Sequence, residues 1–264
     1  MSAPAYLEIA GRRLEYAWHG PAPAAAPTLV FLHEGLGSLG LWRDFPAKLA
    51  AATGCGALVY SRAGYGASDP VALPRPLGYM HEEALGVLPA VLAATGVGEH
   101  ILVGHSDGAS IAVINAGGAP RAGLCGIILE APHVFTEDMG IAAIAAAGAA
   151  YRDGDLRPKL GRWHGGNIDN AFWGWHDVWC DPAFRRWNIE NYLPGIAVPG
   201  LLIQGEDDQY GTIAQVEAVR RRSGAPVRVL MLSDCKHTPH RDQAEKVLAA
   251  MAEFVRGLPA LSGR

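Results

Sequence analysis

Residues 101–110 read Ile-Leu-Val-Gly-His-Ser-Asp-Gly-Ala-Ser and place Ser106 in a G-x-S-x-G pattern. An apolar run precedes the pattern and a run able to form a helix follows it, so we expect a tight strand-to-helix turn with Ser106 at its tip. Gly104 and Gly108 lack a Cβ, which lets neighbouring chain pass close to that strained turn. A serine at a helix N-terminus suits nucleophilic attack, because the N-terminus favours a developing anion. The alternative is a helix start that Ser106 merely caps.

A serine nucleophile needs a base, and the base needs a carboxylate that fixes its tautomer. The chain supplies these types in the order serine, acid, histidine, which is the order used with such a turn. Residues 205–208, Gly-Glu-Asp-Asp, follow an apolar run, and catalytic groups collect at the carboxyl ends of parallel strands. We predict Asp208 as the acid, with Asp207 as the alternate and a solvated turn without a role as the competing interpretation. His237, in a loop before the terminal helix, is predicted as the base.

A second histidine, His240, follows Pro239, and proline favours the first turn of a helix. We therefore expect His240 to be a bystander. His237, His240 and Asp234 could resemble a set of metal ligands, but their spacing is not that of a regular three-ligand site. The sequence predicts neither a metal nor a cofactor.

Acyl transfer produces a negative tetrahedral oxygen that two backbone N–H groups can stabilise. One donor should be Asp107, directly after the nucleophile. The second should come from the glycine-rich loop at residues 33–38, and we assign it to Gly35 with Leu36 as the alternate.

These loops require a sheet that brings them to one edge. Short apolar runs separated by helical patterns predict a mostly parallel central sheet with helices on both faces, which is an α/β fold. A hairpin is expected at residues 6–18, strands at 28–32, 57–60, 101–103, 127–129, 201–203 and 227–232, and helices at 42–52, 80–94, 106–116, 212–222 and 239–255.

Residues 132–195 interrupt this alternation and contain five of the seven tryptophans. A loop of that length without structure is improbable. We predict a small helical cap at 132–195 over the carboxyl edge of a core formed by 1–131 and 196–264, with an ordinary surface excursion as the alternative. Leu36, His133 and Trp173 are predicted to contact substrate. His164 is a further candidate for a polar contact, although histidines such as His133 and His164 more often have a purely structural role.

Composition narrows the classes of partner. The chain has 264 residues, is 50% hydrophobic and carries a formal net charge of -4. This length suits one α/β domain with an insertion. Without a basic run, neither nucleic acid nor an anionic membrane surface is an expected partner. The N-terminus does not resemble a signal peptide and no apolar run reaches about 18 residues, so we expect a soluble, cytoplasmic protein acting on a small molecule. A homodimer is left open.

Five segments together resemble the capped α/β-hydrolase superfamily over nearly the whole chain: residues 33–37 (His-Glu-Gly-Leu-Gly), 61–69 (Ser-Arg-Ala-Gly-Tyr-Gly-Ala-Ser-Asp), 104–108, 205–208 and His237. The likeness is greatest to the branch of small esterases, carbon-carbon bond hydrolases, lactonases and epoxide hydrolases. It implies the α/β-hydrolase fold, the roles given above to Ser106, Asp208, His237, Gly35 and Asp107, and a pocket between cap and core. Epoxide hydrolases and haloalkane dehalogenases have aspartate at the position of Ser106, so their chemistries are not expected.

Two residues depart from the pattern of the superfamily. Many relatives have His-Gly where this chain has His33-Glu34, and methionine or glutamine where it has Asp107. Glu34 could pair with Arg62 as a strut or face the substrate. We favour the strut, because an unpaired anion near a developing oxyanion would oppose catalysis.

The sequence thus predicts a serine hydrolase that cleaves a carboxylic ester, or a related acyl bond, of a small apolar or aromatic substrate through an acyl-enzyme. The same residues could serve a carbon-carbon bond hydrolase, a lactonase or a thioesterase. A ligand-binding module without turnover is the alternative from another class.

Overall fold

A computed structural model describes residues 5–118, 123–259 and 261. Its centre is an eight-stranded sheet in the order β1-β2-β4-β3-β5-β6-β7-β8. β2 pairs antiparallel with β1 and β4, and the other neighbours are parallel. The strands are β1 (Ala5–Ile9), β2 (Arg12–His19), β3 (Thr28–Leu32), β4 (Gly56–Tyr60), β5 (His100–His105), β6 (Leu124–Glu130), β7 (Gly200–Gly205) and β8 (Val227–Leu232).

The sheet follows from the sequence pattern. Ala10 and Gly11 both have positive φ, of 51° and 75°, as a two-residue hairpin turn between twisted strands requires. All residues of β3, β4 and β5 are buried, which is why these strands read as continuous apolar runs. The expected α/β architecture with a mostly parallel sheet is confirmed.

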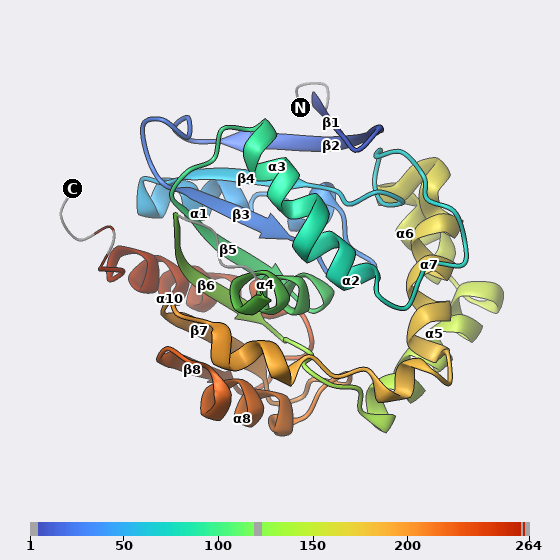
Figure 1. Ribbon diagram of the computed structural model, residues 1–264. Coiled ribbons are helices and arrows are strands. Elements are labelled where there is room, and N and C mark those ends of the chain that lie inside the picture. Colours follow the sequence, from blue (N-terminus) through green and yellow to red (C-terminus); the bar gives the residue numbers. More distant parts are fainter. Residues whose placement is uncertain (1–4, 119–122, 260, 262–264) are drawn as a thin grey trace.

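Helices cover both faces of the sheet and bury one apolar cluster on each side (Figure 1). One face carries α2 (Tyr79–Glu82), the π-helical turn η2 (Glu83–Val87), α3 (Leu88–Ala94), α4 (Asp107–Gly118) and α8 (Ile213–Arg222); the other carries α1 (Phe45–Thr53), α9 (Pro239–Asp242) and α10 (Ala244–Arg256). No helix in the described ranges is both long and apolar enough to span a membrane.

Three of the expected helices differ in detail. The helix expected at 42–52 begins at Phe45, because a 3-10 turn, η1 (Leu39–Trp42), precedes it and Arg43 has a φ of 54°. The helix expected at 80–94 contains a π turn, and Pro89 at the start of α3 has no N–H to donate to the preceding turn. The helix expected at 239–255 is divided at Gln243, whose φ and ψ are -135° and 54°.

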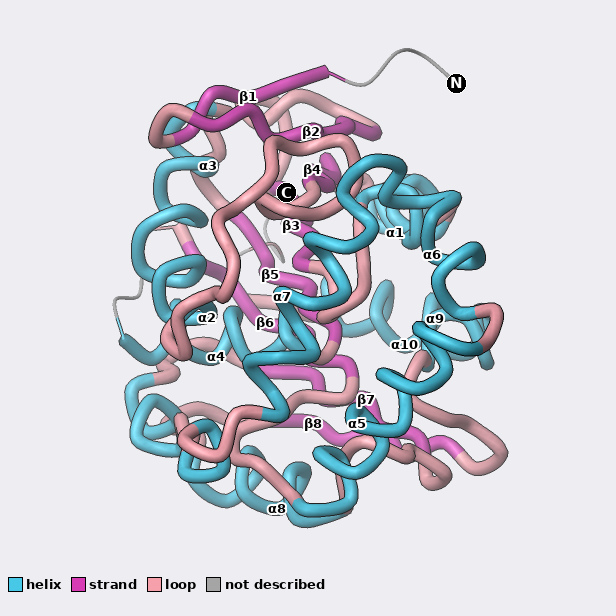
Figure 2. Tube along the Cα trace, turned by 90° about the vertical axis from the view of Figure 1, so that its right-hand side faces the viewer, coloured by secondary structure: helices cyan, strands magenta, loops and turns pink. Residues whose placement is uncertain are grey.

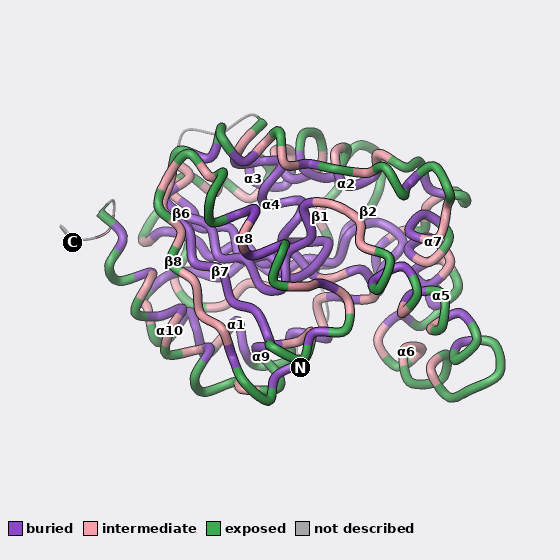
Figure 3. The backbone as a smooth tube through the Cα atoms, turned by 90° about the horizontal axis from the view of Figure 1, so that it is seen from below, coloured by how far each residue is buried: buried purple, intermediate pink, exposed green. Residues whose placement is uncertain are grey.

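Residues 132–195 contain three α-helices, α5 (Asp138–Asp153), α6 (Leu156–His164) and α7 (Ile168–Cys180), and the short turns η3 (Gly165–Asn167), η4 (Phe184–Arg186) and η5 (Glu190–Gly195). Figure 2 shows α5 and α7 in front of the carboxyl ends of the strands. The outer surface of α6 is largely exposed in Figure 3, whereas the central strands β3 to β7 are buried. Residues 132–195 therefore lie over the carboxyl ends of the strands, the edge at which the loops with the candidate site residues begin.

Candidate active site

Ser106 occupies the turn between β5 and α4 with a φ of 53°, a conformation that is strained for a residue with a side chain. A Cβ on Gly104 would collide with the backbone of Gly108, and a Cβ on Gly108 would collide with the backbone of Leu32. The backbone N–H of Ser106 donates to the carbonyl of Glu130 at 2.9 Å. The two glycines are therefore required for the turn that projects Ser106 from the sheet edge.

His237 lies after β8 and meets Asp208, which lies after β7. His237 Nδ1 is 2.9 Å from Asp208 Oδ1 and 2.8 Å from Oδ2. Because a carboxylate only accepts, Nδ1 carries the hydrogen and Nε2 is left to accept a proton. Burial alone would raise the pKa of Asp208, but the hydrogen bond and charge of His237 outweigh it and lower that pKa. The backbone of Asp207 donates to Cys235 instead, and it is Asp208 that the fold brings to the histidine.

Ser106 and His237 open onto one cavity of about 120 Å³. Its wall consists of loops at the sheet edge and helices of residues 132–195. The lining residues are Glu34, Gly35, Leu36, Ser106, His133, Glu137, Gly140, Ile144, Trp175, Trp179, Tyr210 and His237.

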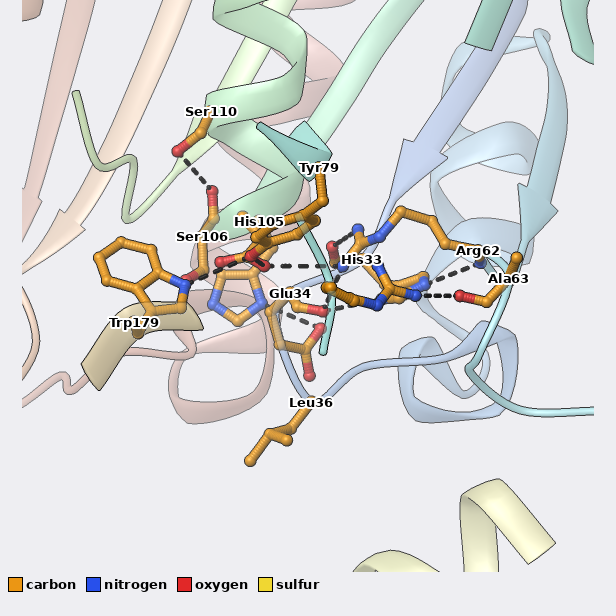
Figure 4. A network of polar contacts seen from close by, with 12 residues as sticks. His33, Glu34, Leu36, Arg62, Ala63, Tyr79, His105, Ser106, Ser110 and Trp179 are labelled. Carbon is orange, nitrogen blue, oxygen red and sulfur yellow. Dashed lines mark hydrogen bonds and ion pairs between the residues drawn. The ribbon is translucent and has the colours of Figure 1, made fainter. Parts of the chain in front are cut away.

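Three donors fix the peptide between Glu34 and Gly35. The Glu34 carbonyl accepts from Arg62 Nη2 at 3.1 Å, from His33 Nδ1 at 2.7 Å and from the Gly37 N–H at 3.0 Å. Figure 4 shows Arg62 reaching the backbone of this loop from the side opposite His105. Since N–H and C=O point in opposite directions across a trans peptide, the anchored carbonyl also fixes the direction of the Gly35 N–H. Within the described chain, that N–H donates to no other protein group.

Asp107 begins α4 and its side chain is buried rather than directed at the cavity. Its carboxylate accepts from the Tyr79 hydroxyl and lies 3.8 Å from Arg62 Nη2. Burial raises the pKa of Asp107, and the nearby Arg62 charge only partly opposes that shift. Trp179 Nε1 donates to the Tyr79 hydroxyl at 3.3 Å, so this polar chain also holds one wall of the cavity.

The predicted pairing of Glu34 with Arg62 as a strut is wrong, because Glu34 has a different partner. Arg62 is 1% exposed and bonds the backbone carbonyls of His33 and Glu34, whereas the Glu34 carboxylate extends away from it. That carboxylate lies 3.4 Å from Nδ1 of His105, the residue before the nucleophile. No pattern in the sequence predicts this contact, because it joins two loops whose relative placement depends on the fold.

Of the predicted substrate contacts, Leu36 and His133 line the cavity and Trp173 does not. α7 turns by about 100° per residue, so Trp173 faces away and packs on Tyr151 with ring centroids 5.4 Å apart. Trp175 and Trp179, four residues apart on one face of α7, line the cavity instead. The spacing of these two tryptophans is the signal that could have identified them.

The remaining predicted residues have identifiable partners. A Cβ on Gly35 would overlap the Trp175 indole, so this loop needs glycine where α7 covers it. Burial lowers the pKa of His133 to about 3, which makes it a neutral lining group. His164 contacts the loop rather than the cavity, with Nε2 3.0 Å from the Leu36 carbonyl.

His240 lies in the first turn of α9, as expected, and does not line the cavity. Its Nδ1 is 2.8 Å from Glu130 Oε2. Among the residues that the structure describes, no group of three or more His, Cys, Asp or Glu side chains is arranged to hold a metal ion.

Comparison with known proteins assigns the chain to a family. Residues 29–250 match the Alpha/beta hydrolase family. The 2-succinyl-6-hydroxy-2,4-cyclohexadiene-1-carboxylate synthase of Salmonella agona is 32% identical over 119 residues, which are 45% of this chain and 43% of that protein. The chain therefore aligns with less than half of that relative.

Solved structures agree over nearly the whole chain. An esterase from Exiguobacterium antarcticum has a TM-score of 0.77 at 18% identity and covers 97% of this chain and 100% of its own. The enol-lactonase from Burkholderia xenovorans has a TM-score of 0.73 at 18% identity, with coverage of 95% and 99%. At such identities these structures establish the fold. The family match over most of the sequence shows that this chain belongs to the alpha/beta hydrolase family.

Proposed function

We propose that the protein cleaves a carboxylic ester, or a closely related acyl bond, of a small uncharged substrate through an acyl-enzyme on Ser106. The observation that carries the proposal is the contact of His237 Nδ1 with Asp208 at 2.8 Å, in a histidine that opens onto the same cavity as Ser106. A buried carboxylate that orients a histidine at the same cavity as a strained serine is an arrangement that can activate a serine hydroxyl.

In the proposed cycle, Ser106 attacks the carbonyl carbon while His237 Nε2 takes the hydroxyl proton. The negative oxygen of the tetrahedral intermediate is stabilised by the N–H groups of Gly35 and Asp107. The intermediate collapses to an acyl-enzyme as His237 protonates the leaving group. Water, activated by His237, then releases the acid. Asp208 holds the imidazole in one tautomer and stays ionised throughout.

The cavity wall favours a compact, uncharged acyl group. Aromatic and aliphatic side chains of Trp175, Trp179 and Ile144 enclose a volume of about 120 Å³. The two charged side chains among its lining residues are carboxylates, Glu34 and Glu137, and the set contains neither lysine nor arginine. A substrate that carries a carboxylate would meet no complementary charge there. The compound for which the Salmonella agona synthase is named is such a carboxylate. We therefore favour a neutral ester over an anionic substrate.

The test is hydrolysis of p-nitrophenyl acetate, butyrate and octanoate, phenyl acetate, an acetyl thioester and an anionic succinyl monoester. The wild type should prefer the short neutral esters, and Ser106→Ala should abolish turnover. Ser110→Ala is the matched control, because that serine donates to the backbone carbonyl of His133 and does not line the cavity.

A burst of p-nitrophenol equal to the enzyme concentration, with the acyl group found on Ser106 by mass spectrometry, would establish the covalent intermediate. Turnover that survives Ser106→Ala, or a preference for the anionic ester, would contradict the proposal.

A further inference from the structure

The loop after β3 carries a carboxylate, that of Glu34, to which the proposed acyl transfer assigns no role. Glu34 immediately precedes Gly35, lines the cavity with Ser106 and has a side chain that is 22% exposed. A negative charge at this position opposes the negative charge that develops on the substrate oxygen at the Gly35 N–H. The proposed reaction is therefore favoured when the charge of Glu34 is cancelled.

The residue before the nucleophile supplies the cancelling charge. His105 Nδ1 lies 3.4 Å from Glu34 Oε2, and His105 Nε2 lies 2.6 Å from the backbone carbonyl of His237. Because a carbonyl only accepts, Nε2 carries a hydrogen and donates it to His237. Nδ1 makes no hydrogen bond in the described structure, but it is buried within ion-pair distance of a carboxylate, and an opposite charge that close favours the imidazolium. Figure 4 shows the Glu34 carboxylate beside the His105 ring, close to Ser106.

The charged groups around His105 favour the same state. Glu130, at the end of β6, adds a second negative charge, while the rings of His237 and His240 pack against His105 with centroids 5.2 Å and 5.3 Å away. His240 has its own partner in Glu130. Burial alone would lower the pKa of His105, but the contact with Glu34 and the charges of Glu34 and Glu130 raise it to about 9. The same contact keeps the pKa of Glu34 well below its usual range despite burial.

We propose that Glu34 and His105 are positioning residues of the active site, whose ion pair neutralises the carboxylate beside the oxyanion hole and joins the three loops that carry Gly35, Ser106 and His237. This inference rests on the proposed acyl transfer. Loss of the His105 proton leaves the Glu34 charge uncompensated, so the chemical step slows while substrate binding in the apolar part of the cavity persists. The ion pair therefore sets the alkaline limit of kcat.

Glu34→Gln is the decisive variant, because the amide keeps the shape of the side chain and can donate to a neutral His105. With phenyl acetate, wild-type kcat should fall about tenfold between pH 8 and pH 10, as expected for a required acid with a pKa near 9. KM should change little. In Glu34→Gln the alkaline fall should disappear.

The matched control is Glu137→Gln, which removes the other carboxylate of the cavity. Thr212 and Gln215 donate to Glu137, and no histidine pairs with it among the described residues. Its alkaline fall should match that of the wild type whatever its basal rate. An alkaline fall retained in Glu34→Gln would overturn the proposal.

A second measurement is independent of turnover. Imidazole nitrogen shifts of histidine-labelled protein, with His105 assigned by comparison with His105→Gln, should show an imidazolium that persists to about pH 9 in the wild type and is lost in Glu34→Gln. Titration of wild-type His105 near pH 6.5 or below would refute the ion pair. Absence of Ser106-dependent turnover would instead refute the acyl transfer, so the two failures are distinguishable.

Discussion

The two sides of the cavity are built by different interactions. The loops at the sheet edge are held by hydrogen bonds and charges, as in the three donors to the Glu34 carbonyl and the contact between Asp208 and His237. The helices of residues 132–195 contribute mainly apolar surface, from Ile144, Trp175 and Trp179. Hydrogen bonds fix direction, whereas apolar packing fixes shape. We infer that the loops determine the reaction and the helices determine which acyl groups enter.

The largest effect is expected at the sheet edge, from Asp208→Asn. The amide cannot hold His237 in the tautomer that leaves Nε2 free to accept, so kcat should fall by about 10⁴-fold with little change in KM. Steady-state kinetics with p-nitrophenyl butyrate measure it. Asp207→Asn is the control, because the carboxylate of Asp207 makes no contact with His237 in the described structure. An equal loss in both variants would show that the acidic turn acts through its total charge.

Arg62→Met tests the charge that supports the glycine-rich loop at residues 33–38. The substitution removes the ion-pair partner of Asp107, which is fully buried, and breaking a buried pair in this way costs about 3–5 kcal/mol of unfolding free energy. Urea denaturation measures the loss. Adding Asp107→Asn should restore part of it, because the uncompensated charge is then removed. Arg13→Met, which breaks the exposed pair with Asp69, should cost much less.

The pair of Glu34 and His105 should also make stability depend on pH. The pKa of His105 rises from 6.5 to about 9 in the folded protein, so its stabilisation is complete below pH 6.5 and is lost as pH rises through 9. The difference in unfolding free energy between wild type and Glu34→Gln should change by about 3 kcal/mol between pH 6 and pH 10. Urea titrations at several pH values measure this change. A constant difference would mean that His105 is neutral throughout.

Much of the sheet edge could be predicted because strand periodicity and topology determine it. Ser106, Asp208 and His237 each follow an apolar run, and parallel strands bring their carboxyl ends to one edge. The partner of Glu34 could not be predicted in this way. Its contact with His105 depends on how the loop turns after β3, and that turn is fixed by donors from distant segments, including Arg62.

The sequence predicts that residues 132–195 form helices, but it does not predict how those helices are oriented. Its length and its tryptophans indicate helices over the sheet, but which tryptophan faces inward depends on where α7 begins and how it is rotated about its axis. Trp173 and Trp175 are two residues apart and therefore lie on opposite faces of the helix. The structure turns Trp175 toward Gly35 and leaves Trp173 on Tyr151 and Arg152.

The smallest effect is expected from Trp175→Ala, and it tests the role of the helices. Removing the indole enlarges the cavity, so kcat/KM for p-nitrophenyl octanoate should rise roughly tenfold relative to that for the acetate, the lower end of the discrimination that a single methylene gives in an apolar pocket. Trp173→Ala, on the other face of α7, should leave the ratio unchanged. An equal loss of kcat for both esters in Trp175→Ala would instead mean that Trp175 holds the Gly35 peptide in place. The helices would then contribute to the reaction as well as to the choice of substrate.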